Sequence, residues 1–501
     1  MSGTDATLVK QAIAQANYAG ATGTSNIDVI NNGEIEFSKK GGTAIAVDYG
    51  QATNNKLIKV DAANVAPTPG AKGENSIGLF GASGSKLTNS STGEIHLGTR
   101  GVGIWGANDL TTSVSTWGKN IDITNTGKII GLTGKKSVFG IYADNDTTAH
   151  PSATSTIVHS GEIDFSTNKE SVGIYMKNGN LTSTGNISIN EGSVGIDATN
   201  SDVTINGGTY TVGKESVGFK LTNIPATKNF FGNSGTINIT DEGSVAYLLN
   251  NSVLTSGTNF KDDLTLNSTK AYTYINTNAS TLNYENIKTI VNDDSMFINA
   301  GNNSTINLLS GTNISSTNKA ITGVYSTRST VKNEGTITLT GDKSSALYAE
   351  GSAVSNEITG KITVAKDGSG IYVKALTTAP VALGSGTNYG EINIGEASVG
   401  IRAEDATIIN ETTGKILSTA KSATGMSQSG GSQNIVNKGT ITLTGDKSTA
   451  LHSEGITTAG HKVINTGDIT VGDSSNELSP SVGIYSANGT TSTVESSGKV
   501  V

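Results

Sequence analysis

The chain has 501 residues, with 63 glycines, 6 prolines, no cysteine and a formal net charge of −8 at pH 7. This acidic balance, with arginine only at Arg100, Arg328 and Arg402, argues against a nucleic-acid-binding surface. No run of apolar residues is long enough to span a membrane as a helix. Isoleucine, valine and leucine recur at strand spacing, which argues against the disorder that so polar a composition would otherwise suggest.

The absence of cysteine has two interpretations. Many proteins use few cysteines for no special reason. A chain that is exported unfolded through a pore would also avoid them, because a premature disulfide would block its passage. Both interpretations stay open on this feature alone.

The first residues favour a short helix over residues 4–20. Thr4 or Asp5 can cap it and Gly20 can end it. The apolar stripe at helical spacing comprises Leu8, Val9, Ala12, Ile13 and Ala16. The segment lacks the basic region and apolar core of a signal peptide. We predict a helical cap over residues 1–22 that covers the open edge of the first coil.

From residue 23 onwards one short pattern recurs, and Ser171-Val172-Gly173-Ile174-Tyr175 shows it clearly. Degenerate copies fit around Lys270 and Phe297. Counted at the small middle residue, the clear copies lie at 44, 78, 103, 140, 173, 195, 218, 246, 323, 346, 370, 400, 425, 450 and 483. A period of this size is the signature of a repeat architecture.

A second pattern, Gly-x-Ile-x-apolar, precedes each copy by a few residues, as at 161–165 and 335–339. An asparagine often stands one or two residues before its glycine; examples are Asn125, Asn333, Asn437 and Asn465. The gaps are too short for the crossover helix of a βαβ unit. We therefore predict an all-β chain: a right-handed parallel β-helix (β-solenoid) of about seventeen coils over residues 23–501, forming one monomeric rod. The strand pattern that begins at Gly498 stops in mid-coil, which predicts that this domain is truncated at its C-terminal end.

Long irregular segments follow the Gly-Ile-Tyr strand at one point of the repeat. We expect loops at 48–74, 106–118, 143–156, 220–232, 373–388 and 427–434. Insertions at the same point of successive coils project from one edge, which is commonly the binding edge. The alternative is that an exposed corner simply tolerates loops.

The repeated strand also predicts an aromatic face. If Val172 and Ile174 point inward, then Ser171, Gly173 and Tyr175 point outward. Coils lie about 4.8 Å apart, so the equivalent rings would form a column suited to the apolar faces of sugars. Phe80 belongs to this register, and the candidate ligand-binding residues are Trp105, Tyr142, Tyr175, Tyr325, Tyr348, Tyr372 and Tyr485. The alternative is that the rings only shield backbone, since Asp197, Lys220, Arg402 and His452 interrupt the column.

Catalytic patterns are weak. Glycoside hydrolysis needs two placed carboxylates, and the nearest candidates are Asp262-Asp263 and Asp293-Asp294, which lack the His-Gly and Arg-x-Lys partners of β-helical pectin hydrolases. The five histidines show no metal-binding spacing, and Asp144-Asn145-Asp146 stands without a calcium-binding repeat. We predict that the chain is not an enzyme and has no catalytic site, no metal and no cofactor.

The sequence Asn-x-Gly-Thr-Ile-x-Leu-Thr-Gly-Asp-Lys-Ser-x-Ala-Leu occurs at 333–347 and 437–451. It resembles the repeats of passenger domains in giant fusobacterial autotransporter adhesins, and the resemblance covers nearly all of residues 25–501. It implies type V secretion, with a signal peptide upstream, an outer-membrane β-barrel downstream and a location at the cell surface. It also implies attachment to host cells and coaggregation with other bacteria, through surface glycans of the galactose type or receptor proteins. No binding residue carries over, because the matching motif is the repeat itself.

Two alternatives to an adhesin stay open. The chain could be a purely structural stalk that presents an adhesive tip elsewhere in a longer protein. It could also be a β-helical polysaccharide-degrading enzyme.

Overall fold

The computed structural model describes residues 14–16, 28–37, 41–48, 50–61, 76–82, 84–107, 120–145, 154–431, 433–455, 460–473, 480–487 and 493–501. These residues form short β-strands and no helix, so none of them belongs to a helix that could cross a membrane. The chain divides into two compact units. Unit 1 comprises Met1–Ser252 and Thr258–Thr269, and unit 2 comprises Val253–Gly257 and Lys270–Val501.

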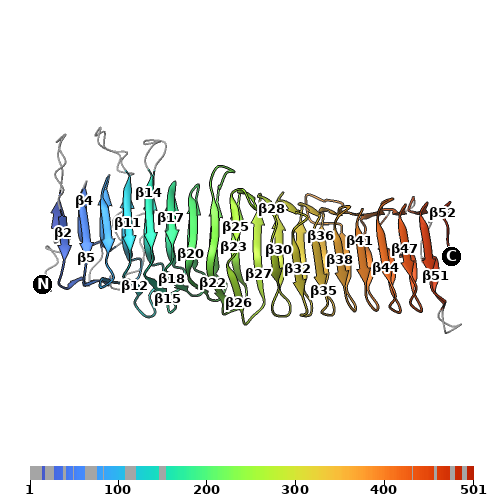
Figure 1. Cartoon of the computed structure of the whole chain (residues 1–501), viewed down its shortest axis with the longest axis horizontal. Helices are drawn as coiled ribbons and strands as arrows, with labels where there is room; N and C mark the ends of the chain where they lie inside the picture. The colour runs from blue at the N-terminus through green and yellow to red at the C-terminus, as the bar shows by residue number, and fades with distance from the viewer. Residues whose placement is uncertain are drawn as a thin grey trace. The chain divides into compact units, whose positions relative to one another are not determined.

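Within unit 1 the coils contribute strands to three parallel sheets, and the strands of successive coils lie side by side (Figure 1). Sheet A holds the Gly-Ile-Tyr strands: β1 (Ala14–Ala16), β4 (Thr43–Asp48), β7 (Ile77–Ala82), β10 (Val102–Ala107), β13 (Phe139–Asp144), β16 (Val172–Lys177), β19 (Val194–Thr199), β21 (Val217–Thr222) and β23 (Ser244–Asn250). Sheet B follows it along the chain: β2 (Asp28–Asn31), β5 (Gln51–Asn54), β8 (Lys86–Asn89), β11 (Ile121–Asn125), β14 (Ser155–His159), β17 (Gly179–Ser183) and β25 (Phe260–Asp262). Sheet C holds the Gly-x-Ile strands: β3 (Ile35–Phe37), β6 (Leu57–Val60), β9 (Glu94–Leu97), β12 (Lys128–Gly131), β15 (Glu162–Phe165), β18 (Asn186–Ile189) and β26 (Thr265–Ser268). The long strands β20 (Asp202–Val212) and β22 (Phe230–Ile239) run through both sheets B and C.

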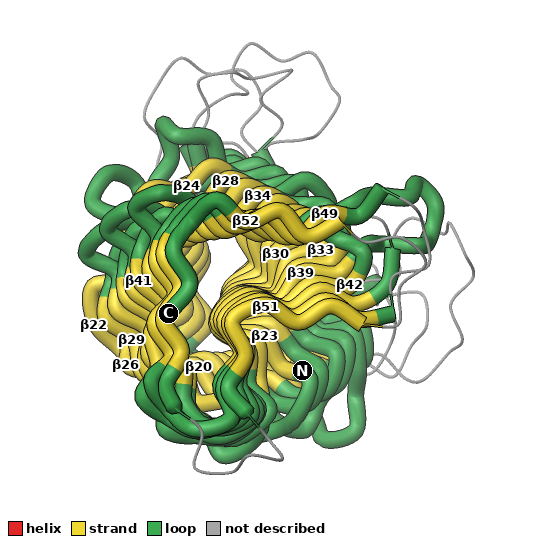
Figure 2. The backbone as a smooth tube through the Cα atoms, turned by 90° about the vertical axis from the view of Figure 1, so that its right-hand side faces the viewer, coloured by secondary structure: helices red, strands yellow, loops and turns green. Residues whose placement is uncertain are grey.

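Unit 2 also has three kinds of parallel strand, for which the names sheet A, B and C are kept, and Figure 2 shows them around its interior. Its sheet A comprises β27 (Tyr272–Asn278), β30 (Met296–Gly301), β33 (Thr322–Thr327), β36 (Ser345–Glu350), β39 (Ser369–Lys374), β42 (Val399–Glu404), β45 (Thr424–Ser429), β48 (Thr449–Glu454) and β51 (Val482–Ala487). Its sheet B comprises β24 (Val253–Thr255), β28 (Thr281–Tyr284), β31 (Thr305–Leu308), β34 (Thr330–Asn333), β37 (Ala353–Asn356), β40 (Ser385–Asn388), β43 (Thr407–Asn410), β46 (Ile435–Asn437), β49 (Lys462–Asn465) and β52 (Thr493–Ser496). Its sheet C comprises β29 (Ile287–Thr289), β32 (Asn313–Ser316), β35 (Thr336–Leu339), β38 (Lys361–Val364), β41 (Glu391–Ile394), β44 (Lys415–Ser418), β47 (Thr440–Leu443) and β50 (Asp468–Val471).

The predicted all-β parallel solenoid is thus confirmed. Each clear copy of the repeat lies in a strand of sheet A, and the degenerate copies around Lys270 and Phe297 correspond to β27 and β30. The core consists of columns of like residues, because each strand pairs in parallel with its counterpart one coil later. In sheet C of unit 2, for example, Ile337, Ile362 and Ile392 are in register and fully buried. At about 25 cal/mol per Å² of buried apolar surface, such columns spread stability along the coils.

The predicted helical cap is wrong where the structure describes it. Ala14–Ala16 form the strand β1, which pairs in parallel with Ile45–Val47. The rest of the predicted cap, residues 1–13 and 17–22, lies outside the described residues. The open edge of a sheet offers backbone hydrogen bonds to a strand, whereas a helix of this length is marginal without extensive packing.

The side-chain alternation expected in sheet A is also wrong in part. In β16 both Gly173 and Ile174 are buried, and Ser171 just before the strand is only 1% exposed, whereas Val172 is half-buried. A Cβ added to Gly173 would come within 2.5 Å of the carbonyl oxygen of Gly195 in the next coil. The backbones of neighbouring coils therefore approach closely at this glycine. Two consecutive residues, Gly173 and Ile174, are buried, so the alternation of inward and outward positions is interrupted once. After this interruption Tyr175 faces outward, as expected.

A ladder of buried asparagines lines the corner between sheets B and C. In unit 2 it comprises Asn333, Asn356, Asn388, Asn410, Asn437 and Asn465, all fully buried. Each Nδ2 donates to the Oδ1 of the next asparagine at 2.8 Å, and Asn388 also donates to the Gly390 carbonyl that follows the turn at 3.2 Å. The ladder satisfies buried polar groups at every coil. Sequence analysis noted the recurring asparagine but assigned it no role.

A corresponding ladder in unit 1 ends on a histidine. Asn31, Asn54, Asn89 and Asn125 follow one another at 2.8–2.9 Å. Asn125 Nδ2 then lies 3.1 Å from Nδ1 of the buried His159, whose Nε2 lies 3.3 Å from the Asn186 carbonyl. This arrangement fits a neutral imidazole that carries its proton on Nε2. Burial lowers the pKa of His159 to about 4.

Replacing Asn388 with alanine tests the ladder. The change removes the acceptor of Asn356 and the donor to Asn410, and a buried polar group without its partner costs about 1–3 kcal/mol. We expect the free energy of unfolding of this region to fall by about 2–4 kcal/mol, measured by denaturant unfolding. Asn313→Ala, at an exposed position of the same unit, is the matched control and should change it by about 0.5 kcal/mol or less. Equal effects of the two substitutions would contradict a structural role for the ladder.

His159 makes stability depend on pH. Its pKa is lowered in the folded state from 6.5 to about 4, so between these values the unfolded chain binds the proton and the folded chain does not. Stability is therefore lost as the pH falls through this window, by about 3 kcal/mol in total. His159→Asn should flatten this part of the profile of unfolding free energy against pH, and His96→Asn, at a partly exposed site, should not. An unchanged profile in His159→Asn would contradict the role of His159 in this pH dependence.

Candidate ligand-binding face

The outer side of sheet A in unit 2 carries a column of tyrosines. Tyr325, Tyr348 and Tyr372 occupy the same register position in β33, β36 and β39, and all three are half-buried. The ring centroids of Tyr325 and Tyr348 lie 5.2 Å apart in a stacked arrangement, and those of Tyr348 and Tyr372 lie 4.7 Å apart edge to face. The structure therefore brings these predicted residues together.

The same register continues beyond the tyrosines. Arg402 follows Tyr372, and its guanidinium lies 4.8 Å from the ring centroid of Tyr372. Further along, His452 stacks on Tyr485 at 5.1 Å. Tyr485, 42% exposed, is thus separated from the three tyrosines of this column by Arg402, Ser427 and His452.

Carboxylates flank the tyrosine column. The Tyr348 hydroxyl donates to Glu350 at 3.2 Å, and the Tyr372 hydroxyl donates to Glu404. Arg402 Nη2 lies 3.2 Å from the same Glu404 carboxylate. Burial, and after it the negative charge of Glu350, raises the pKa of Tyr348 to about 12. The phenol is therefore a neutral hydrogen-bond donor at physiological pH.

Unit 1 has a second aromatic column, at the equivalent position of its own sheet A. Phe80, Trp105, Tyr142 and Tyr175 are in register. Phe80 and Trp105 lie 5.8 Å apart, Trp105 and Tyr142 lie 5.6 Å apart, and Tyr142 and Tyr175 stack at 4.7 Å. The column ends where the next coils carry an ion pair between Lys220 and Asp197, with 2.8 Å between Nζ and Oδ2.

The predicted insertions have mixed outcomes. The loop expected over 48–74 is wrong in part, because Gln51–Asn54 and Leu57–Val60 are the strands β5 and β6, and residues 62–75 lie outside the described residues. Much of the segments at 106–118 and 143–156 also lies outside them. The connections expected at 220–232, 373–388 and 427–434 are shorter than expected. After the strands of sheet A they comprise 223–229, 375–384 and 430–434, and residue 432 lies outside the described residues.

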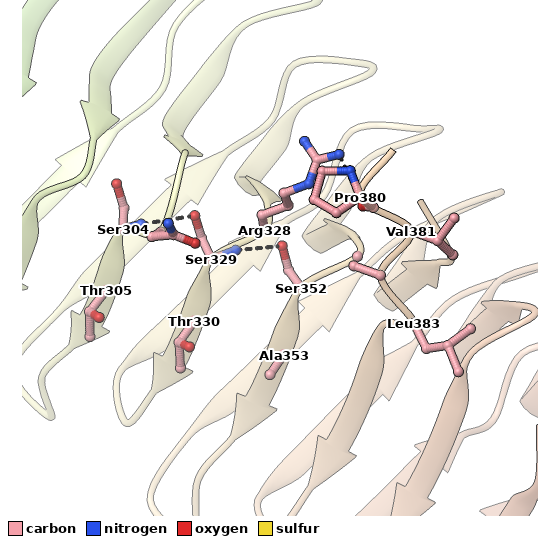
Figure 3. Close-up of a pocket in the computed structure, with 13 residues that line it drawn as sticks. Ser304, Thr305, Arg328, Ser329, Thr330, Ser352, Ala353, Pro380, Val381 and Leu383 are labelled. Carbon is pink, nitrogen blue, oxygen red and sulfur yellow. Dashed lines mark hydrogen bonds between the residues drawn. The ribbon is translucent and has the colours of Figure 1, made fainter. Parts of the chain in front are cut away.

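The connection at 375–384 shapes a groove at the corner between sheets A and B. It folds back on itself, since the backbone N–H of Leu376 donates to the Ala382 carbonyl at 2.9 Å and that of Ala382 donates to the Leu376 carbonyl at 3.2 Å. The groove beside this hairpin has a volume of about 480 Å³. Figure 3 shows a row of serines, a second row with two threonines and an apolar edge: Ser304, Ser329 and Ser352; Thr305, Thr330 and Ala353; and Pro380, Val381 and Leu383.

Arg328 lies between these two rows and the hairpin. It adopts a left-handed backbone with φ of 48° directly after β33. Its Nη2 donates to the carbonyl oxygens of Thr378 and Pro380 at 3.1 and 3.2 Å. Sequence analysis gave this arginine no role. Its contact with the hairpin joins residues about 50 positions apart in the sequence, so no local signal could have found it.

The acidic pairs considered for catalysis do not form facing carboxylates. Asp262 points into unit 1, where it is 3% exposed and accepts a hydrogen bond from the Tyr247 hydroxyl at 2.8 Å. Asp263 is exposed, and its Oδ2 lies 2.9 Å from Lys261 Nζ. In unit 2, Asp293 accepts a hydrogen bond from the backbone N–H of Lys319 at 2.8 Å. Within the part of the chain that the structure describes, no cluster of three metal-ligating side chains occurs.

Residues 206–498 match the model of a protein family described as the BigA third pectate lyase-like domain. The chain belongs to this family. The match supports the coarser part of the resemblance found in the sequence, a β-helix passenger domain of the bacterial autotransporter type, and does not test the fusobacterial adhesins in particular. No curated protein sequence gives a significant match. The words pectate lyase-like concern the fold of this domain family and carry no evidence for or against an activity.

Removing rings from the outer face of this pectate lyase-like domain should leave the fold largely intact. Tyr348 is half-buried and contacts mainly its column neighbours, so Tyr348→Ala should lower the free energy of unfolding by about 1 kcal/mol. Tyr247 is fully buried inside unit 1 and stacks on Phe219 at 5.4 Å, so Tyr247→Ala should cost about 3–5 kcal/mol. Denaturant unfolding of both variants measures the difference, and a loss at Tyr348 as large as that at Tyr247 would show that the outer ring is part of the core.

Proposed function

We propose that this chain is the surface-exposed passenger of a bacterial autotransporter and mediates attachment to host cells or to other bacteria by lectin-like binding of glycans. The observation that carries the proposal is the tyrosine column of unit 2 with its flanking carboxylates. The family match supports the passenger architecture on which the proposal rests. The anchoring of the passenger in an outer membrane is part of the same proposal.

The chemistry of the column suits sugars. An exposed ring edge or face packs against the C–H groups of a pyranose, while Glu350 and Glu404 can accept hydrogen bonds from its hydroxyls. One ring is presented about every 4.8 Å along the stacked coils, so a linear glycan that lies along the column can contact several rings. Weak contacts that repeat along a surface give useful avidity to a cell-bound protein.

We further propose that the domain is not catalytic. Asp262 is occupied by Tyr247 and faces away from solvent, and Asp263 contacts Lys261, which leaves neither placed opposite a second carboxylate across a substrate site. Release of oligosaccharide products from a polysaccharide, lost in Asp262→Asn or Asp293→Asn, would overturn this part of the proposal.

A glycan-array screen on the purified chain tests binding directly. We expect saturable binding that free sugar competes away, and a loss of about tenfold or more in affinity in Tyr348→Ala and Tyr372→Ala. The matched control is Tyr389→Ala, which removes a half-buried tyrosine at the corner between sheets B and C of the same unit. A folded chain that binds no glycan would contradict the proposal and favour a stalk or a protein receptor.

A further inference from the structure

The groove beside the 375–384 hairpin contains one charge. Of the thirteen residues that line it, all within the described part of unit 2, Arg328 is the only one that is ionised at neutral pH. Among the described residues no carboxylate lies within ion-pair distance of its guanidinium. Glu350, whose backbone carbonyl accepts from the Arg328 N–H at 3.1 Å, has its carboxylate next to the Tyr348 hydroxyl instead. The contrast with Arg402 is clear, because Arg402 pairs with Glu404.

The guanidinium is held in place but is not saturated. Only Nη2 is engaged, by the carbonyl oxygens of Thr378 and Pro380. Nε is buried without a hydrogen-bond partner, and Nη1 has none among the described residues. A cation fixed by two neutral carbonyls keeps its full positive charge and loses little entropy when an anion binds.

The rest of the groove suits a sugar ring. Thr305 and Thr330 are accessible on the two strands β31 and β34, and their hydroxyls can donate to and accept from ligand hydroxyls. The hydroxyls of the neighbouring serine row already form hydrogen bonds with the backbone. Ser329 and Ser352 accept from the backbone N–H groups of Ser304 and Ser329 at 3.2 and 3.0 Å. On the hairpin side, Val381 and Leu383 are 69% and 56% exposed and offer an apolar surface. A volume of about 480 Å³ lies within the range of small-molecule sites, about 300–1,000 Å³.

We propose that this groove binds a carboxylated sugar, with the sugar carboxylate on Arg328, its hydroxyls at Thr305 and Thr330 and its apolar face against the hairpin. The inference rests on the proposed glycan-binding function and names a ligand class for it. Carboxylated pyranoses reach a cell-surface protein from two sources: sialic acids that terminate glycan chains, and uronic acids within polysaccharides.

Isothermal titration calorimetry with matched pairs of sugars tests the proposal: sialyllactose against lactose, and oligogalacturonate against its methyl ester. We expect the acidic member of at least one pair to bind about ten- to a hundredfold more tightly than its neutral partner, and which pair responds identifies the source. Arg328→Gln should abolish this preference. Lys361→Gln, which removes one positive charge from an exposed site on sheet C, should preserve it.

Arg328→Gln can also loosen the hairpin, so a second variant is needed. Thr330→Glu places a competing carboxylate at an exposed position of the groove and leaves the contacts of Nη2 intact; it should weaken binding of the acidic sugar about tenfold or more. Equal affinity for acidic and neutral sugars, or a preference that survives in both variants, would overturn this inference while leaving glycan binding standing. No binding of any sugar by the folded chain would overturn both, and tight binding of inorganic phosphate alone would show an anion site rather than a sugar site.

Discussion

Within each unit, successive coils are held in one backbone register, and the other features of the structure depend on it. Parallel hydrogen bonds join strands to their counterparts one repeat later. The buried asparagines fix the same register at the corner of sheets B and C, because each amide bonds to the next one at 2.8 Å in unit 2. At Gly173, and at equivalent glycines such as Gly195 and Gly400, an added Cβ would come within 2.6 Å of a carbonyl oxygen in the next coil. A slip of one residue would break all of these contacts together.

Because of this register, equivalent residues of successive repeats lie side by side and together form continuous surfaces. Residues at one position of the repeat form a column, buried at the position of Ile337 and outward-facing at the position of Tyr348. The fold thereby places Tyr325, Tyr348 and Tyr372 next to one another although more than twenty residues separate each from the next. Insertions add features that the regular columns do not form, such as a groove. The groove with Arg328 exists only because the connection at 375–384 folds over a corner that is otherwise bare, and it brings an apolar edge beside a row of hydroxyls.

Much of the fold could be predicted from the sequence, because a fixed repeat determines which strands pair and which residues share a face. The tyrosine column was predictable for the same reason. The inward direction assigned to Val172 was wrong, because simple alternation ignores the contact that Gly173 makes with the next coil. The expected helix around Ala14–Ala16 was wrong because tertiary pairing with β4 overrides a local amphipathic pattern. The role of the asparagines and the position of Arg328 depend on contacts between coils and on the path of a hairpin, which no local pattern encodes.

We propose that the outer face of sheet A in unit 2, together with the groove at its corner, is the glycan-binding surface. Hydrogen–deuterium exchange of the chain, with and without saturating lactose, sialyllactose or oligogalacturonate, tests it most directly. We expect a bound sugar to slow exchange in β33, β36, β39 and the 375–384 hairpin and to leave sheet C of the same unit unchanged. Slower exchange confined to sheet C, or no change with any of these sugars, would contradict it.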